Sequence, residues 1–162
     1  MAENPDLLVG AGTVLRPAQV QAALQAGARY IVSPGFSASV VRECQRSGVP
    51  VLPGVATATE IQAALEAGLD AVKFFPAETS GGLAALKALA APFRGLRFVP
   101  TGGIRADGLA AYLAEPSVLA VGGSWLVSAE LLAARDFAQI THLAAAAVRA
   151  VRAVRARTGV SP

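Results

Sequence analysis

The stretch "DAVKFFPAE", Asp70–Glu78, combines the apolar residues of a buried strand with a lysine near its centre. Lysine is strongly hydrated and is seldom buried without a reason. The chain has 14 basic residues but only two lysines, Lys73 and Lys87, so the place of Lys73 between Val72 and Phe74 is informative. The strand that it interrupts belongs to a pattern that runs along most of the sequence.

Short apolar runs that stop in glycine or proline alternate with alanine-rich amphipathic stretches. The apolar runs are LLVGAGTV (Leu7–Val14), YIVSPG (Tyr30–Gly35), PVLPGVA (Pro50–Ala56), AVKFFP (Ala71–Pro76), RFVPTGG (Arg97–Gly103) and VLAVGGS (Val118–Ser124). The stretches between them, such as residues 17–28 and 59–68, predict helices, and both of these end in an Ala-Gly pair that is typical of a helix C-terminus. Strands rich in Val, Leu and Ile alternating with helices indicate parallel βα units.

Six such units follow one another, which leaves an open doubly wound sheet or a barrel as the architecture. Several strands end in small residues and glycines, as the substrate loops at the C-terminal rim of a barrel require. We therefore interpret the fold as an α/β (β/α)8 TIM barrel, of which this chain supplies roughly βα units 3–8, with two units missing at its N-terminus. We expect one partial barrel domain over residues 1–162, with a C-terminal helix at about 136–157.

Composition excludes several classes of protein. With 54% apolar and 15% charged residues the chain is typical of a globular domain, and no apolar run is long enough to span a membrane. Its start lacks the features of a signal peptide, and the single cysteine fits a reducing cytoplasm. The net charge of +3 depends on four arginines near the C-terminus, and aromatic residues are few, so we expect no nucleic-acid partner; these arginines are Arg149, Arg152, Arg155 and Arg157.

Strand alternation places Ala71, Lys73 and Phe75 on one face and the bulkier apolar pair Val72 and Phe74 on the other. The apolar pair suits a layer of helices, so Lys73 is expected to point into the barrel. Desolvation there would lower the pKa of its amine, and a neutral amine can attack a ketone to form a Schiff base. A lysine that merely reaches solvent from a strand end is the alternative.

Two consecutive strand ends carry paired glycines, in PTGGI (Pro100–Ile104) and VGGSW (Val121–Trp125). Paired glycines let backbone N–H groups approach an anion closely, so these loops predict a phosphate site. Thr13, Pro34 and Thr101 are expected near the same rim, although each fits ordinary turn chemistry too. One histidine and one cysteine cannot build a zinc site, and we expect no metal.

The segments "VGAGTV", "SPG", "PGVAT", "KFFPAE", "PTGGI" and "GGSWL", in this order and spacing, resemble the 2-keto-3-deoxy-6-phosphogluconate (KDPG) aldolases, also described as 4-hydroxy-2-oxoglutarate aldolases, over about Leu7–Arg152. The resemblance implies a class I aldolase. Such an enzyme reversibly splits a phosphorylated keto-deoxy sugar acid into pyruvate and glyceraldehyde 3-phosphate, in the Entner–Doudoroff route. It also implies a homotrimer that uses neither a metal nor an organic cofactor.

The resemblance further implies a role for each matching residue. Lys73 matches the Schiff-base lysine, and Thr13 matches the threonine that holds the pyruvyl carboxylate. Pro34 and Phe75 would shape that pocket, while Thr101 would line the substrate path. The residues that match the phosphate cradle are Gly102, Gly103, Gly122, Gly123 and Ser124.

The chain departs from the family in one respect: the family's general acid/base glutamate and a substrate-binding arginine precede the point where this sequence begins. The chain is then a fragment or mis-started form of an aldolase, which we favour, a genuine shortened protein, or a decayed paralogue. Two other functions compete: a non-catalytic phosphate- and keto-acid-binding remnant, and another phosphate-binding barrel enzyme such as an epimerase or a thiamine-phosphate synthase-like protein. The latter does not require Lys73. The sequence leaves the preferred keto acid open.

Overall fold

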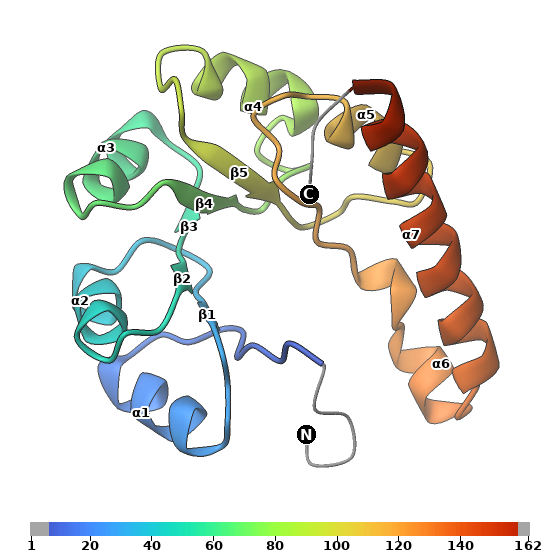
Figure 1. Ribbon diagram of the computed structural model, residues 1–162, viewed down its shortest axis with the longest axis horizontal. Coiled ribbons are helices and arrows are strands. Elements are labelled where there is room, and N and C mark those ends of the chain that lie inside the picture. The colour runs from blue at the N-terminus through green and yellow to red at the C-terminus, as the bar shows by residue number, and fades with distance from the viewer. Residues whose placement is uncertain (1–6, 159–162) are drawn as a thin grey trace. The chain divides into compact units, whose positions relative to one another are not determined.

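A computed structural model describes residues 7–158, which divide after Phe75 into two compact units (Figure 1). The elements of the first unit are α1 (Pro17–Gln25), β1 (Ile31–Val32), α2 (Ala38–Arg46), β2 (Val51–Leu52), β3 (Gly54–Val55), α3 (Ala58–Glu66) and β4 (Ala71–Phe74). The elements of the second unit are α4 (Gly82–Ala90), β5 (Arg97–Pro100), α5 (Leu109–Leu113), the 3₁₀ helix η1 (Ser124–Leu126), α6 (Ala129–Ala133) and α7 (Phe137–Thr158).

Strand pairing in the first unit is parallel. Ile31 of β1 is opposite Val51 of β2, and Gly54 of β3 is opposite Lys73 of β4. One helix lies between the strands of each pair in the sequence, α2 in the first case and α3 in the second (Figure 1). These are the parallel βα units that the alternating sequence pattern predicts.

The strands are shorter than the apolar runs that predict them. The run Leu7–Val14 forms a single bridge, from Ala11 to Ile31, and Val118–Ser124 likewise forms only bridges, to Phe98 and Thr101. Glycine packs nothing along a strand and weakens it, which accounts for the short pairing in these glycine-rich runs.

The run Pro50–Ala56 is divided into two strands at Pro53, since proline has no N–H with which to continue a ladder. The carbonyl of Pro53 still accepts a hydrogen bond of 2.8 Å from the backbone N–H of Lys73. The segment at Pro53 is therefore still hydrogen-bonded to β4, the strand that carries Lys73.

The core of the first unit forms as the sequence pattern predicts. Val72 and Phe74 of β4 are fully buried. A second group joins the α1–β1–α2 region, and its buried members are Val14, Val20, Ile31, Val40, Cys44 and Val49. Cys44 is a free thiol whose pKa is raised by burial. It acts there as a small apolar side chain.

The helix ends follow from local sequence signals. Gly27 and Gly68, the second residues of the two Ala-Gly pairs, have φ angles of 91° and 76°, the left-handed backbone that closes a helix. At the other end of α3, Thr57 accepts a hydrogen bond of 3.3 Å from the N–H of Glu60, and the Glu60 carboxylate accepts one of 2.9 Å from the N–H of Thr57. This reciprocal capping fixes where α3 begins.

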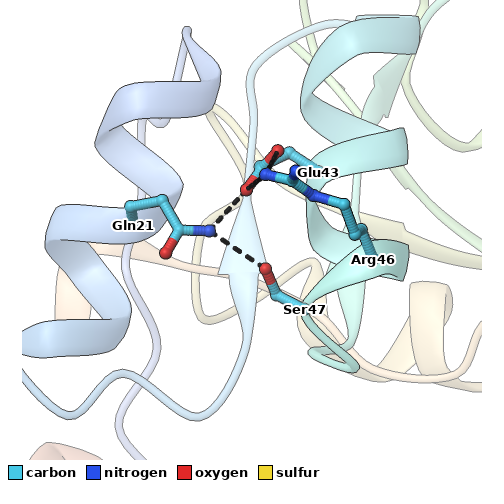
Figure 2. Close-up of polar contacts among 4 residues, drawn as sticks. All are labelled: Gln21, Glu43, Arg46 and Ser47. Atoms are coloured by element: carbon cyan, nitrogen blue, oxygen red, sulfur yellow. Dashed lines mark hydrogen bonds and ion pairs between the residues drawn. The ribbon is translucent and has the colours of Figure 1, made fainter.

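A group of four polar side chains connects α1 to α2 (Figure 2). Arg46 donates two hydrogen bonds to the carboxylate of Glu43, at 2.7 and 2.6 Å, and the amide of Gln21 donates to Glu43 and to the hydroxyl of Ser47. These bonds, chiefly those from Arg46, hold the pKa of Glu43 below its ordinary value. The group adds exposed polar contacts between α1 and α2 to the apolar core that the two helices share.

In the second unit, α7 packs against α5 and η1 (Figure 1). Leu109, Leu113 and Val154 are buried at this contact, with Trp125 and Val151 packed against them. The helix α7 covers Phe137–Thr158, and its Arg149, Arg152 and Arg157 are exposed. Within residues 7–158, the structure contains no helix with the length and apolar character that crossing a membrane requires.

Candidate active site

Lys73 lies in β4 between two fully buried neighbours, but its own side chain is only partly buried. Its Nζ lies 4.0 Å from the centre of the Phe75 ring. None of the carboxylates in residues 7–158 forms an ion pair with it. Partial removal from water lowers the pKa of the Lys73 amine below its ordinary value, because desolvation disfavours the charged form. An unpaired amine with a lowered pKa is a candidate nucleophile.

Gly54, the partner of Lys73 on β3, brings a third segment close to the lysine strand. A Cβ atom at Gly54 would lie 2.0 Å from the backbone oxygen of Pro34, so only glycine fits there. Pro34, Gly54 and Lys73 therefore lie next to one another in turn. The structure thus brings three of the predicted pocket residues, Pro34, Lys73 and Phe75, into one region of the first unit.

Ser33 fixes the turn that carries Pro34. Its side chain is buried, at 2% exposure, and its hydroxyl donates to the Gly35 carbonyl at 2.8 Å. Its backbone N–H bonds to the Leu52 carbonyl at 3.3 Å. Sequence analysis did not select Ser33, and only the Ser-Pro-Gly order could have indicated that its side chain turns back onto the loop.

Thr13 has an unusual backbone. Its φ is 58°, which is rare for a β-branched residue, and its side chain is exposed. The next residue, Val14, donates to the Val32 carbonyl at 3.1 Å, so Thr13 lies beside the end of β1. No hydrogen bond within residues 7–158 joins its side chain to Lys73. Strained backbone of this kind concentrates at functional sites, which keeps Thr13 a candidate binding residue.

The two glycine loops lie side by side in the second unit. Thr101 pairs with Gly122, and the N–H of Gly122 donates to the Pro100 carbonyl at 2.9 Å. Gly102 and Gly103 have φ angles of 105° and 79°, which other residues rarely adopt. The structure therefore brings together the loops predicted to bind phosphate.

Close contacts explain why the second loop also needs glycine. A Cβ at Gly122 would lie 2.5 Å from the Thr101 hydroxyl, and one at Gly123 would lie 1.5 Å from the Trp125 ring. Ser124 opens η1 with its side chain exposed. Exposed backbone that lacks side chains is what a phosphate oxygen needs in order to reach N–H donors.

Glu78 and Tyr112 support the first glycine loop, and sequence analysis assigned neither a role there. The N–H of Glu78 donates to the Gly102 carbonyl at 3.0 Å, and the N–H of Ala77 donates to Thr101 at 2.8 Å. The Tyr112 hydroxyl donates to the Glu78 carboxylate at 2.6 Å. Burial first, and then this bond to Glu78, raises the pKa of Tyr112. The place of Glu78 in the KFFPAE segment was the available signal.

Within residues 7–158, no three His, Cys, Asp or Glu side chains gather into a group that could hold a metal ion. The described residues show three features: parallel βα units, a strand lysine without an ion-pair partner, and glycine loops at strand ends. Together they are the features expected of an α/β-barrel enzyme with an amine nucleophile and an anion-binding loop.

Comparison with known proteins gives the family. A model of the KDPG and KHG aldolases matches residues 1–143. The chain is 57% identical over 141 residues to a 2-dehydro-3-deoxy-phosphogluconate aldolase of Treponema pallidum, an alignment that covers 87% of this chain and 67% of that protein. The chain belongs to the KDPG and KHG aldolase family, which confirms the recognition made from the sequence.

Solved structures agree with this assignment. A KDPG aldolase from Legionella pneumophila, with pyruvate captured as a covalent carbinolamine intermediate, has a TM-score of 0.84 and 41% identity, covering 88% of this chain and 69% of that chain. A Zymomonas mobilis KDPG aldolase with 3-phosphoglycerate also has a TM-score of 0.84, with 46% identity over 90% of this chain and 68% of its own. The barrel-like α/β fold class and the assignment as an aldolase-type lyase are confirmed.

Proposed function

We propose that this chain is a class I aldolase that cleaves 2-dehydro-3-deoxy-6-phosphogluconate into pyruvate and glyceraldehyde 3-phosphate through a Schiff base on Lys73. The observation that carries the proposal is the state of that amine, which is partly buried, unpaired by any described carboxylate, and lowered in pKa by desolvation. Lys87, by contrast, is exposed and paired with Glu115 at 3.8 Å. Only one of the two lysines is suited to attack a carbonyl.

The reaction begins when the neutral Nζ of Lys73 attacks the C2 ketone of the substrate. A carbinolamine forms and loses water, which leaves a protonated imine. This cation withdraws electrons from the neighbouring C3–C4 bond. The lysine imine is therefore the electron sink of the cleavage.

Cleavage then releases the aldehyde half. The C4 hydroxyl passes its proton to a general base, the C3–C4 bond breaks, and its electron pair moves toward the imine to form an enamine of pyruvate. Protonation of the enamine at C3 and hydrolysis of the imine release pyruvate and restore the free amine.

Substrate recognition divides between side chains and backbone. In the proposed complex, Thr13 binds the pyruvyl carboxylate while Pro34 and Phe75 enclose the pyruvyl methylene. Thr101 lines the path, and the phosphate is held by Gly102, Gly103, Gly122, Gly123 and Ser124. The adjacency of Pro34 and Phe75 to the lysine strand supports the first part, and the paired glycine loops support the second.

We further propose that the enzyme is a homotrimer that acts on small molecules in the cytoplasm. Its second proposed substrate is 4-hydroxy-2-oxoglutarate. Exposed apolar side chains on or beside α6 and α7 support self-association, because water-exposed apolar surface favours a protein contact; they are Val127, Leu132, Phe137 and Val148. The free thiol of Cys44 fits a reducing compartment.

A coupled assay tests the activity. Pyruvate released from each of the two substrates is reduced by lactate dehydrogenase, and the loss of NADH is followed. Turnover of the phosphorylated substrate that depends on Lys73 supports the proposal. Pyruvate capture at Lys73 without any turnover would instead favour the alternative of a keto-acid-binding remnant.

A further inference from the structure

Glu78 is the point at which three segments of the second unit meet. Its side chain belongs to the loop between β4 and α4, its backbone bonds to the Gly102–Gly103 loop, and its carboxylate bonds to Tyr112 of α5. Tyr112 is only 3% exposed. Glu78 itself is exposed, so the 2.6 Å hydrogen bond from this buried hydroxyl is what holds its carboxylate against α5.

The stem of Glu78 also limits the shape of the glycine loop. A Cβ atom at Gly103 would lie 2.9 Å from the Cβ of Glu78 and 3.0 Å from its Cγ, so the side chain packs directly on the backbone of Gly103. A Cβ atom at Gly82 would lie 3.5 Å from the Glu78 carboxylate and 3.5 Å from the Tyr112 hydroxyl. Movement of Glu78 would therefore displace the glycine loop and the start of α4.

A carboxylate beside an anion-binding loop presents a problem that the structure resolves. A negative charge repels a phosphate whether it is mobile or fixed, and the repulsion falls with distance. The stem of Glu78 packs on Gly103, but its carboxylate lies beside Gly82 and accepts from Tyr112, so the hydrogen bond keeps this charge directed toward α5. The N–H groups of the loop must also keep fixed directions in order to bind a phosphate. The Glu78–Tyr112 hydrogen bond serves both needs.

We propose that Glu78 and Tyr112 are positioning residues that hold the Gly102–Gly103 loop in its phosphate-binding form and so set the preference of the enzyme for phosphorylated keto acids. The inference rests on the proposed function, since it assigns a device to the phosphate end of that same site. Neither side chain needs to touch the reacting atoms.

The test compares two substrates that differ only in the phosphate, 2-keto-3-deoxy-6-phosphogluconate and 2-keto-3-deoxygluconate, in the full chain. Tyr112→Phe removes one hydroxyl, and we expect it to raise KM for the phosphorylated substrate about tenfold while kcat, and KM for the unphosphorylated one, stay unchanged. Glu78→Gln keeps an acceptor for the tyrosine and should remain near the wild type, whereas Glu78→Ala should behave like Tyr112→Phe. Tyr30→Phe, in the other tyrosine, is the matched control.

A second readout separates this inference from the proposed function. Binding of inorganic phosphate, followed by calorimetry, should weaken about tenfold in Tyr112→Phe, while borohydride trapping of pyruvate on Lys73 stays at the wild-type level. Absence of trapping in the wild type would contradict the aldolase proposal. The positioning role of Glu78 and Tyr112 would then be decided by the phosphate-binding measurement. Equal losses with both substrates, or unchanged phosphate affinity in a folded Tyr112→Phe protein, would overturn the positioning role.

Discussion

The lysine strand of the first unit and the glycine loops of the second unit prepare for chemistry in opposite ways. At Lys73 the reactive group is a side chain, and buried neighbours on the same strand remove part of its water. At Gly102 and Gly103 the proposed binding groups are backbone N–H donors, which an anion can reach because side chains are missing. The reactivity of the lysine strand therefore depends on the surroundings of one side chain. The anion binding proposed for the glycine loops depends on the absence of side chains from the backbone.

Substitution should therefore affect the two regions differently. In the lysine strand, a change of side chain removes the chemistry and leaves the backbone intact. In the glycine loops, any added side chain disturbs the backbone itself. A given variant should alter either covalent capture of pyruvate or recognition of phosphate, and only a general loss of folding should alter both.

The largest effect is expected for Lys73→Met. Loss of the nucleophile should lower turnover by more than about 10⁴-fold and abolish pyruvate trapping, because no other group supplies the imine. Steady-state kinetics measures the first effect and mass spectrometry the second. Lys87→Met is the matched control, since the Lys87 side chain is exposed and forms an ion pair with Glu115. Comparable losses in the two variants would erase the distinction between the lysines.

The next effect is expected for Gly122→Ala. Its new methyl group would meet the Thr101 hydroxyl at 2.5 Å, so the loop must shift. We expect KM for the phosphorylated substrate to rise by about 10–100-fold, by the loss of one or two charge-assisted hydrogen bonds, while pyruvate trapping is retained. Gly108→Ala is the control, because its methyl group would meet the nearest atom at an ordinary 3.6 Å. Reduced trapping in a folded Gly122→Ala protein would contradict the division of roles.

A smaller effect is expected for Thr13→Asn. Asparagine tolerates the left-handed backbone that threonine adopts here at φ 58°, so relief of strain should stabilise the fold by about 1 kcal/mol. That corresponds to a rise in melting temperature of about 2–4 °C, measured by calorimetry. Affinity for pyruvate should fall in the same protein. Increased stability with unchanged affinity would mean that Thr13 holds no substrate carboxylate.

The smallest effect concerns pH and stability. The Lys73 pKa is lower in the folded chain than in the unfolded chain, so the unfolded chain binds more protons between the two values. Stability of the wild type should therefore rise, relative to Lys73→Met, as pH increases toward the ordinary lysine value of about 10.4. Urea unfolding at a series of pH values measures the difference. Parallel stability curves would show that the amine is as hydrated in the fold as in the unfolded chain.

Local signals in the sequence predicted much of the fold and part of the site. The alternation of Val72, Lys73 and Phe74 on β4 and the helix ends at Gly27 and Gly68 depend on residues that are neighbours in the chain. The fold class followed from their repetition. The single-domain organisation and the role of each site residue remain predictions.

Other features could not be predicted, because they depend on contacts between distant residues or on unusual backbone. Tyr112 and Glu78 are 34 positions apart, and neither sequence segment indicates the other. The left-handed backbone at Thr13 runs against the preference of its residue type. The predicted strand Pro50–Ala56 is divided at Pro53, because proline has no N–H. The proline is visible in the sequence, but the apolar pattern alone favoured one continuous strand.

Borohydride reduction of the full chain in the presence of pyruvate, followed by peptide mapping, tests the central claim most directly. The amine of Lys73 should carry the reduced pyruvyl adduct, and the peptide that contains Lys87 should remain unmodified. A folded protein in which Lys73 stays unmodified, or in which both lysines react equally, would contradict the account.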